Sequence, residues 1–289
     1  MTDESFIPSP GLLKVSDHSR SFLAMTYVYP VVSRRAQGVS IGINLSPNNA
    51  CNWRCRYCQV PDLTRGTSPA LNFPLFKSEL ERLTDAICNG TFLEDHAPPE
   101  ARTLKDFAFS GNGEPTSCPD FPAAVKHVGE VRARFGLANR VALVLITNGS
   151  LVNRATVREG LQVLSEYGGE VWFKLDRGSD SALASANGTS ISLTKQLLRL
   201  RRTSELCRTR IQTCWYTTDS EDPSPTEVDE YVACLERAIG LGVRLASVQL
   251  YTLARKPQLP EGAVLGEVSA GWLSDMGARL AKLGLIVDL

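Results

Sequence analysis

Cys51-Asn52-Trp53-Arg54-Cys55-Arg56-Tyr57-Cys58 places three cysteines in eight residues, separated by three and then by two other residues. A loop of this length can turn three thiolates toward one centre about the size of an iron–sulfur cube, and cysteine thiolates are the usual ligands of such clusters. Three ligands for four irons would leave one iron open. A reactive site needs such an open position, whereas a structural metal site is closed. The stretch therefore predicts a reactive iron–sulfur centre held by Cys51, Cys55 and Cys58.

Other interpretations of the three cysteines remain open. A structural zinc site would need a fourth ligand nearby, and the next candidates along the chain, Cys88 and His96, are far from the loop. A disulfide framework would suit a secreted protein, but the polar, acidic N-terminus is unlike a signal peptide. Simple burial of the cysteines is disfavoured by Asn52, Arg54 and Arg56 between them.

Composition is that of an ordinary globular chain. Its 289 residues carry 31 Lys and Arg against 31 Asp and Glu, so no global field steers polyanions. No apolar run reaches membrane-spanning length, which predicts a protein without a membrane partner. Eight cysteines without a secretory signal favour reduced thiols or metal ligands in a cytoplasm.

Strand and helix patterns alternate about six times along the chain, which predicts a parallel sheet with right-handed crossovers. An eight-unit barrel of this kind takes about 250 residues, so six units in about 210 residues favour an open α/β structure, a partial (β/α)6 TIM-like barrel. We expect an N-terminal extension at 1–37, the barrel at 38–255, and a C-terminal helix and short strand packed on it at 256–289. Strands are predicted at 39–45, 106–110, 141–146, 171–176, 210–216 and 243–252, an edge strand within 22–32, a last short strand at 285–289, helices at 76–88, 120–134, 154–167, 192–205, 224–238 and 272–283, and a loop at 89–104.

The spacing of the three cysteines resembles the Cys-x3-Cys-x-aromatic-Cys signature of the radical S-adenosylmethionine (SAM) superfamily, with Tyr57 at the aromatic position. Asn112-Gly113-Glu114-Pro115 resembles the Gly-Gly-Glu-Pro motif of that family and departs from it at Asn112. Together with Ser40–Leu45, Trp172–Asp176 and Gln249–Thr252, these stretches look most like the branch related to tRNA wyosine synthases. The resemblance covers residues 38–255.

This resemblance implies a [4Fe–4S] cluster and SAM as cofactors. SAM would chelate the open iron, and an electron from the cluster would split it into methionine and a 5′-deoxyadenosyl radical. The electron implies a low-potential donor such as flavodoxin or ferredoxin.

Polar residues follow the predicted strands in order, at the carboxyl ends where sites form in parallel α/β folds. Ordinary turn chemistry would account for Asn-Gly-Glu-Pro and Thr-Asn-Gly taken singly, and a lone lysine is usually at the surface. With SAM in view, Glu114 is predicted to pair with its amino group and Lys174 with its carboxylate. Asp176 or Asn148 would hold ribose hydroxyls, and Tyr57 with the last strand would flank adenine. The full set of predicted cofactor-binding residues is Tyr57, Asn112, Gly113, Glu114, Thr147, Asn148, Lys174, Asp176, Gln212 and Tyr251.

Five further cysteines are outside this signature, and most are expected to be small buried side chains. Cys118 follows the Glu114 turn and is the predicted candidate for a hydrogen-atom donor or substrate contact. Cys207 and Cys214 are too few for a second cluster unless Cys118 joins them.

The basic residues between positions 195 and 210 allow two interpretations, one of which is a site for a phosphate-bearing substrate. Six cations stand near Glu205, either as a solvated helix face or as a phosphate-binding patch: Lys195, Arg199, Arg201, Arg202, Arg208 and Arg210. Arg54 and Arg56, in the cysteine loop, would lie nearer the radical and could hold an anionic group.

Our leading hypothesis is a radical SAM enzyme that abstracts hydrogen from a small or medium-sized anionic substrate. A tRNA-base-modifying enzyme, a glycyl-radical-enzyme activating protein and a non-catalytic iron–sulfur electron carrier are the alternatives.

Overall fold

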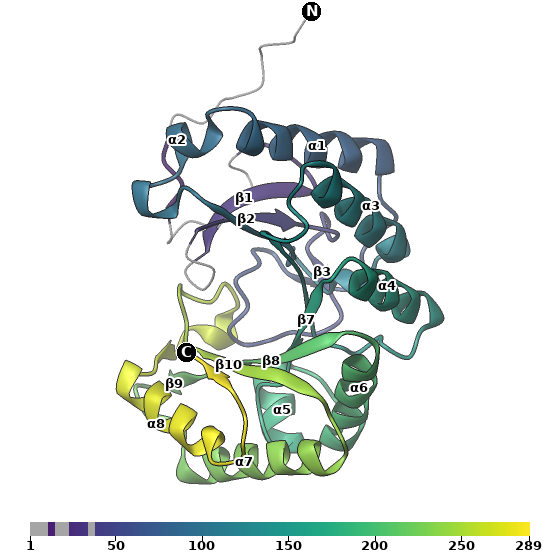
Figure 1. Cartoon of the computed structure of the whole chain (residues 1–289). Coiled ribbons are helices and arrows are strands. Elements are labelled where there is room, and N and C mark those ends of the chain that lie inside the picture. Colours follow the sequence, from purple (N-terminus) through teal and green to yellow (C-terminus); the bar gives the residue numbers. More distant parts are fainter. Residues whose placement is uncertain (1–10, 15–22, 34–37) are drawn as a thin grey trace, which may run out of the picture.

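The computed structural model describes residues 11–14, 23–33 and 38–289, and its main feature is one curled sheet with helices packed around its outside (Figure 1). Its strands are hydrogen-bonded in the order β1-β2-β5-β6-β7-β8-β10-β12. Every neighbouring pair from β2 to β12 is parallel, whereas β1 runs antiparallel to β2. The strands of this sheet are β1 (Val28–Ser33), β2 (Gly38–Ile43), β5 (Leu104–Phe109), β6 (Ala142–Thr147), β7 (Glu170–Lys174), β8 (Arg208–Cys214), β10 (Leu245–Tyr251) and β12 (Val287–Asp288).

Helices carry the chain back after each of six parallel strands, so the predicted partial (β/α)6 barrel is confirmed. β1 and β12 stand at the two ends of the strand order, so the barrel is open. Ser224 begins one of these helices with the capping box predicted by Ser-Pro-Thr-Glu. The helices are α1 (Phe73–Cys88), α2 (Phe92–His96), α3 (Phe121–Arg134), α4 (Ala155–Glu166), α5 (Asp180–Asn187), α6 (Leu193–Leu206), α7 (Pro225–Gly240) and α8 (Ala270–Ala281).

The two faces of the sheet differ because side chains alternate along each strand. One face is apolar and in register across β5 to β10, and it packs against the helices; Phe109, for example, meets Phe121 of α3 with ring centroids 6.1 Å apart. The inner face is small at Gly42 and Ala108 and polar further along the sheet. Its polar side chains are therefore directed to the inside of the barrel.

Two helices lie where the sequence pattern did not indicate them. The predicted loop at 89–104 contains α2, which is fixed by the buried ring of Phe92, and a 3-10 turn, η1 (Pro99–Ala101). Helix α5 is made largely of small residues and buries Leu183, Ala186 and Asn187, too few apolar positions for a helical period to stand out.

Two short ribbons of two strands each lie outside the main sheet. The predicted strand at 210–216 is interrupted, since β8 ends at Cys214 and the separate β9 begins at Tyr216. These ribbons are β3 (Ala50–Cys51) with β4 (Thr64–Arg65), and β9 (Tyr216–Thr218) with β11 (Leu265–Glu267). Two further 3-10 turns are η2 (Pro115–Ser117) and η3 (Pro260–Gly262).

The predicted edge strand is present as β1, and part of the lead-in expected before it lies outside the described residues. The last helix and strand follow β10 as expected, with β12 paired to β10. The division into an extension, a barrel and a C-terminal segment stays a prediction. Within the part of the chain that the structure describes, no helix is both long and apolar enough to span a membrane.

Candidate functional site

The cysteine loop, residues 51–58, lies above the carboxyl end of the sheet. Its start is fixed by the β3–β4 ribbon, in which the Gly66 amide donates to the Cys51 carbonyl at 3.1 Å. A turn follows, with the Cys58 amide donating to the Cys55 carbonyl at 2.9 Å. The three cysteines thus belong to one short loop whose start and end are both fixed by backbone hydrogen bonds.

Burial sets the chemistry of these thiols. It raises the pKa of Cys51 to about 11 and that of Cys55 to about 12, so both are protonated when free at neutral pH. A metal would have to displace those protons, because the thiolate is the ligand form. Among the described residues, no group of three or more His, Cys, Asp or Glu side chains is placed so that it could hold a metal ion.

Glu114 follows β5 and is 2 % exposed. One carboxylate oxygen accepts from the Thr116 amide at 3.1 Å and from the hydroxyls of Thr116 and Thr147 at 2.6 Å each. The other accepts from the Asn148 amide at 2.7 Å. Burial raises the pKa of Glu114, although these donors act against that shift. The carboxylate is held rigidly between the ends of β5 and β6.

Gly113 lets this turn approach the cysteine loop. A Cβ at this position would lie 2.0 Å from the Ala50 carbonyl oxygen, so only glycine fits. Asn112 beside it donates from Nδ2 to Asn49 Oδ1 at 2.6 Å and from its amide to Asn44 Oδ1 at 2.8 Å. Its own Oδ1 is buried and lacks a hydrogen-bond partner among the residues that the structure describes. That unpaired acceptor is of the kind an ammonium group would satisfy.

The end of β6 ties the loop down from a second side. Asn148 Nδ2 donates to Asn52 Oδ1 at 2.9 Å, and Asn52 Nδ2 donates to Ser150 Oγ at 2.7 Å. Asn148 is thus a structural tether as well as a predicted cofactor contact. Its neighbour Thr147 binds Glu114, as described above.

A second network of polar side chains lies at the ends of β7 and β10. Lys174 Nζ donates to the hydroxyls of Tyr57 at 3.0 Å and Tyr251 at 3.1 Å. The Tyr57 hydroxyl in turn donates to Asp176, which also accepts from the Cys214 amide at 2.9 Å. Burial alone would lower the pKa of Lys174, but Tyr251 and Asp176 outweigh it, so the pKa lies above its ordinary value. Lys174 is a cation in this network.

One side chain in this network had no signal in the sequence. Asn187, at the end of α5, donates from Nδ2 to Asp176 Oδ2 at 2.7 Å and to Cys55 Sγ at 3.2 Å. Its position depends on the helix that periodicity did not indicate. Gln212 lies within β8, between Lys174 and Gln249 in register, and its buried Nε2 has no hydrogen-bond partner in the described ranges 11–14, 23–33 and 38–289. It belongs to the barrel interior, below the strand ends.

The predicted role of Cys118 gains no support from its position. Its thiol is buried in the main hydrophobic core, where it donates to the Pro69 carbonyl at 3.6 Å. Cys214 lies at the site instead, in a small cluster with Tyr57 and Tyr216. Its inward orientation at the end of β8 depends on strand register, which the sequence alone does not fix.

Arg54 and Arg56 extend from the cysteine loop toward η3. Arg54 Nε lies 2.9 Å from Glu261 Oε1, and Arg56 Nε donates to the Glu261 carbonyl at 3.2 Å. Both arginines are therefore engaged by the segment after β10. A substrate anion would have to displace Glu261 to bind Arg54.

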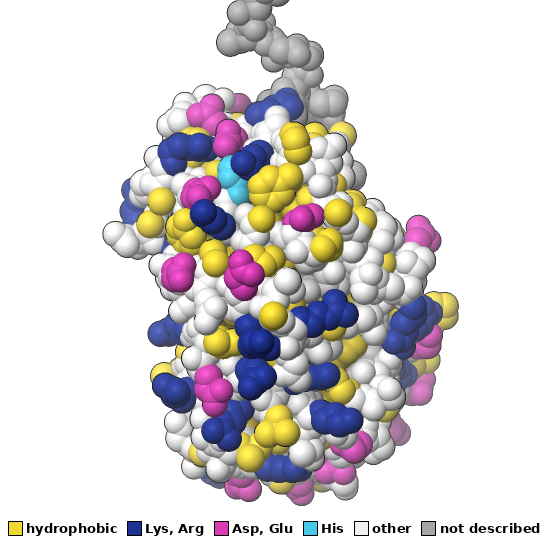
Figure 2. Space-filling model, turned by 90° about the vertical axis from the view of Figure 1, so that its right-hand side faces the viewer, with side chains coloured by type: hydrophobic (Ala, Val, Ile, Leu, Met, Phe, Trp, Pro, Cys, Tyr) yellow, Lys and Arg dark blue, Asp and Glu magenta, His cyan; other side chains and the backbone are white. Residues whose placement is uncertain are grey.

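The basic run divides into separate groups. Arg210 faces the barrel interior, where it pairs with Glu170 at 3.0 Å and Asp288 at 2.9 Å, and Arg208 also pairs with Glu170. Cations of α6 share the side of the molecule that carries α4, and Figure 2 shows dark-blue side chains gathered across the middle and lower part of this side. The exposed cations on α4 and α6, or at the start of either helix, include Arg154, Lys195, Arg201 and Arg202.

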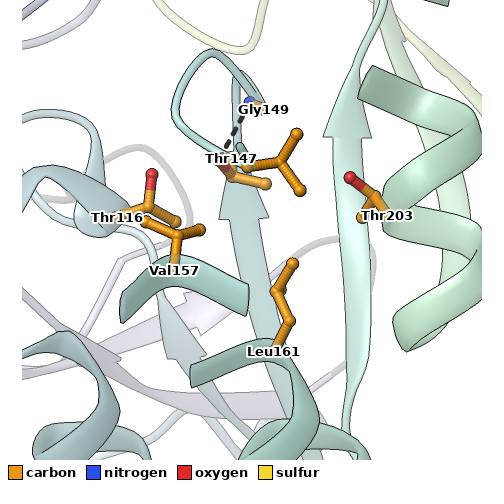
Figure 3. Close-up of a pocket in the computed structure, with 7 residues that line it drawn as sticks. Thr116, Thr147, Gly149, Val157, Leu161 and Thr203 are labelled. Carbon is orange, nitrogen blue, oxygen red and sulfur yellow. Dashed lines mark hydrogen bonds between the residues drawn. The ribbon is translucent and has the colours of Figure 1, made fainter. Parts of the chain in front are cut away.

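The pocket in Figure 3 lies between β6, α4 and α6, behind the Glu114 turn. Thr116 and Thr147 line it, and Thr147 Oγ1 accepts from the Gly149 amide at 3.0 Å. Most of the other lining side chains, such as Val157 and Leu161, are apolar. This pocket lies beside the polar network and contains none of its charged groups.

The charges at the strand ends suit a small cation. Glu114 and Asp176 are two carboxylates, and Lys174 is one ammonium group. SAM carries a sulfonium, an ammonium and a carboxylate, so its net positive charge complements this set. The cysteine loop, the Glu114 turn and the Lys174 network thus offer thiolate, acceptor and donor groups in one region.

Comparisons of the sequence with known proteins give one partial likeness. No family model matches the chain. Over 153 residues it is 26 % identical to the GTPase Obg of Brachyspira hyodysenteriae (strain ATCC 49526 / WA1). The matched region is 53 % of this chain and only 20 % of the Obg protein.

Solved structures give a broader likeness. TYW1 with a lysine–pyruvate adduct bound matches with a TM-score of 0.53 at 16 % identity, over 84 % of this chain and 73 % of that one. A radical SAM methyltransferase from Sphaerobacter thermophilus matches with a TM-score of 0.57 at 15 % identity, over 90 % of this chain and 67 % of that one. HydG, a maturase of the [FeFe]-hydrogenase, matches with a TM-score of 0.54 at 14 % identity, over 83 % of this chain and 48 % of that one. The chain thus shares the partial-barrel fold of these proteins.

Proposed function

We propose that this chain is a radical SAM enzyme that binds a [4Fe–4S] cluster through Cys51, Cys55 and Cys58. The observation that carries the proposal is the attachment of the cysteine loop and of Asn49, just before it, to the ends of three successive strands, beside two buried carboxylates and Lys174. When bound, the cluster supplies the electron that cleaves SAM to methionine and a 5′-deoxyadenosyl radical. The fold likeness to a radical SAM methyltransferase supports the same assignment.

The residues of the chain would divide the work of holding SAM. Glu114 and Asn112 present acceptors toward the amino group, and Lys174 presents a donor toward the carboxylate. Asp176 and Asn148 offer hydrogen bonds to ribose, while Tyr57 and Tyr251 flank the adenine side. Thr147 fixes Glu114, and Gln212 offers its unpaired Nε2 inside the barrel.

Anaerobic reconstitution tests the proposal. The wild-type protein should contain close to four irons and four sulfides per chain, and after reduction by dithionite it should release 5′-deoxyadenosine from SAM. The Cys51/Cys55/Cys58→Ala variant should do neither. Cys88→Ala is the matched control, because Cys88 is exposed and lies outside the site. A cluster without SAM cleavage would favour the electron-carrier alternative, and a full cluster in the triple variant would exclude this ligand set.

The substrate part of the proposal is a small or medium-sized molecule with an anionic group. Arg54 and Arg56 support it, since they are the cations of the cluster loop and the Glu261 carboxylate that pairs with Arg54 is itself exposed. Glu261→Gln would free Arg54 and should strengthen binding of an anionic substrate. A glycyl-radical partner would instead be revealed by an electron paramagnetic resonance signal on that partner protein.

A local basic surface favours tRNA as the second candidate substrate. Arg154, Lys195 and Arg202 are exposed on α4 and α6 or at their starts, and Figure 2 shows Lys and Arg side chains gathered on the side of the molecule that carries these helices. Gel-shift titration of bulk tRNA at low and moderate salt tests this candidate, because phosphate contacts weaken steeply with salt. Binding should be lost in the Arg154/Lys195/Arg202→Ala variant and kept in Lys282→Ala, because Lys282 is an exposed lysine that caps the end of α8. Absence of binding at low salt would exclude tRNA.

The proposal includes an oxidoreductase in the cytoplasm that is reduced by a flavodoxin or ferredoxin. The eight free cysteines support that location, because free thiols persist in a reducing compartment. A GTPase activity like that named for the Obg protein is not proposed, because the sequence contains no Gly-x4-Gly-Lys-Ser/Thr phosphate loop.

A further inference from the structure

The carboxyl end of α5 is the surface against which the cysteine loop rests. Gly188 follows the helix in the left-handed region at φ +56°, and a Cβ there would lie 2.6 Å from the Arg54 carbonyl oxygen. The last carbonyls of a helix have no partner within it. Here Ala186 O accepts from the Arg56 amide at 2.9 Å, and Asn187 O accepts from the Arg54 amide at 3.0 Å. The loop therefore completes the helix end.

The side chain of Asn187 extends this contact to one of the cluster ligands. Asn187 is fully buried, and its Nδ2 donates both to Cys55 Sγ and to Asp176 Oδ2, at 3.2 and 2.7 Å. A carboxylate and a ligating thiolate are acceptors only, so the amide nitrogen has to face them. The Asn187 Oδ1, on the other side, has no hydrogen-bond partner within the described part of the chain. The orientation of the amide is thus set by the two acceptors.

Hydrogen bonds to ligand sulfurs are one of the factors that set the reduction potential of iron–sulfur clusters. Reduction adds negative charge that the ligand sulfurs share, so a donor to such a sulfur stabilises the reduced form more than the oxidised form. Asp176, an anion on the same amide, would oppose reduction if it approached Cys55 directly. Asn187 stands between the two and keeps the carboxylate on the side of Tyr57.

We propose that Asn187 is a positioning residue that raises the reduction potential of the cluster through its hydrogen bond to Cys55. The inference rests on the proposed function, because it requires a cluster on the three cysteines. It assigns to α5 a purpose beyond packing, namely the control of how readily the cluster takes its electron.

Two substitutions at position 187 remove the donor and differ in size. Asn187→Leu keeps most of the side-chain volume, whereas Asn187→Ala removes it. Gln196→Leu is the matched control, because Gln196 is an equally buried amide that donates to the backbone carbonyls of Asn148 and Lys174. Each SAM-free protein is reconstituted, its iron and sulfide are measured, and its potential is found by a redox titration followed by electron paramagnetic resonance.

We expect the equilibrium constant for one-electron reduction to fall several-fold in both Asn187 variants and to stay unchanged in Gln196→Leu; a tenfold fall is about 59 mV. A shift shared by Leu and Ala reflects the missing donor, since the two differ in packing. Equal potentials in all four proteins would overturn the inference and leave the proposed function standing. Folded Asn187 variants that both lack a cluster would also overturn it, in favour of a role in cluster assembly. A wild-type protein without a cluster would overturn the proposed function itself.

Discussion

Glu114 illustrates how one buried carboxylate can serve both the fold and the site. Four donors converge on it, from Thr116, Thr147 and Asn148, and they join the ends of two strands. Its position therefore does not depend on SAM. A ligand ammonium would find the carboxylate already oriented, which reduces the cost of ordering on binding.

Two substitutions separate these roles. Glu114→Ala leaves several buried donors unpaired, at about 1–3 kcal/mol for each group, so the free energy of unfolding should fall. Glu114→Gln keeps the volume and one acceptor oxygen, but its NH2 group would replace the oxygen that accepts from the Asn148 amide. It should therefore lose less stability than Glu114→Ala and still lose SAM affinity by about 2–5 kcal/mol through loss of the charge. Urea unfolding and SAM titration calorimetry measure the two effects. Wild-type SAM affinity in Glu114→Gln would remove Glu114 from the SAM site.

Lys174 is the residue whose substitution tests the opposite end of SAM. Lys174→Met keeps an apolar stem of similar length and removes the ammonium, so SAM binding should weaken by about 2–5 kcal/mol. Lys195→Ala is the control, because Lys195 is an exposed lysine on α6. Equal SAM affinity in wild type and Lys174→Met would show that the carboxylate binds elsewhere.

At the scale of elements, the strands and long helices were predictable because their apolar residues recur with a clear period. Helix α5 was not, since Asp180–Asn187 is mostly small residues and its end is defined by Gly188 and by contact with the cysteine loop. The Cys55–Asn187 contact links residues 132 positions apart. Such a contact depends on the packing of two elements, so local sequence patterns could not indicate it.

Gly188 gives a prediction for that element. Gly188→Ala combines a strained left-handed backbone with a Cβ 2.6 Å from the Arg54 carbonyl, so α5 should lose stability by about 1–3 kcal/mol. Hydrogen exchange of the Arg54 and Arg56 amides should then speed up relative to wild type. Gly136→Ala is the control, since it has a similar φ of +67° and open space around it. Equal exchange rates in the two variants would mean that the close contact with the loop adds nothing.

His127 of α3 should make the free energy of unfolding depend on pH. This side chain lies beside Glu81, Glu130 and Lys77. Burial lowers the pKa of His127 below its ordinary value, and Lys77 adds to this against the two glutamates. The neutral form is therefore favoured in the folded chain. Its stabilisation is complete above pH about 6.5 and declines as pH falls below that value, because the unfolded chain takes up the proton first.

The free energy of unfolding should thus fall more steeply between pH 7 and 5.5 in wild type than in His127→Gln. Urea unfolding at several pH values in this range measures both slopes. Parallel slopes would show that His127 has the same pKa in the folded and unfolded chains.

At the scale of the whole molecule, the basic run shows what a linear sequence cannot separate. Arg201 and Arg210 are nine positions apart, yet one pairs on the surface with Glu205 and the other lies inside the barrel with Glu170 and Asp288. Strand register and the return of the C-terminus decide this. The order of strands was predictable from alternation, whereas the partners of these charges required the curled sheet.

Arg210 joins β7, β10 and β12, so it links the barrel to the C-terminal segment predicted at 256–289. Its Nη1 donates to Ser247 Oγ at 2.7 Å and to Asp288 at 2.9 Å. The Arg210 side chain is 23 % exposed and that of Asp288 43 %, so solvent screens the pair in part. A double-mutant cycle with Arg210→Ala and Asp288→Ala should give a coupling of about 0.5–1 kcal/mol in urea unfolding.

The pair of Arg279 and Asp229, between α8 and α7, is the matched control for that cycle. Both of its side chains are more exposed, at 45 % and 67 %, and the pair lies outside the sheet. Its coupling should be close to zero, because exposed ion pairs contribute little. If Arg210–Asp288 couples no more strongly than this control, the ion pair does not contribute to the attachment of β12. A stronger coupling would mean that this ion pair helps to hold β12 at the end of the sheet opposite β1.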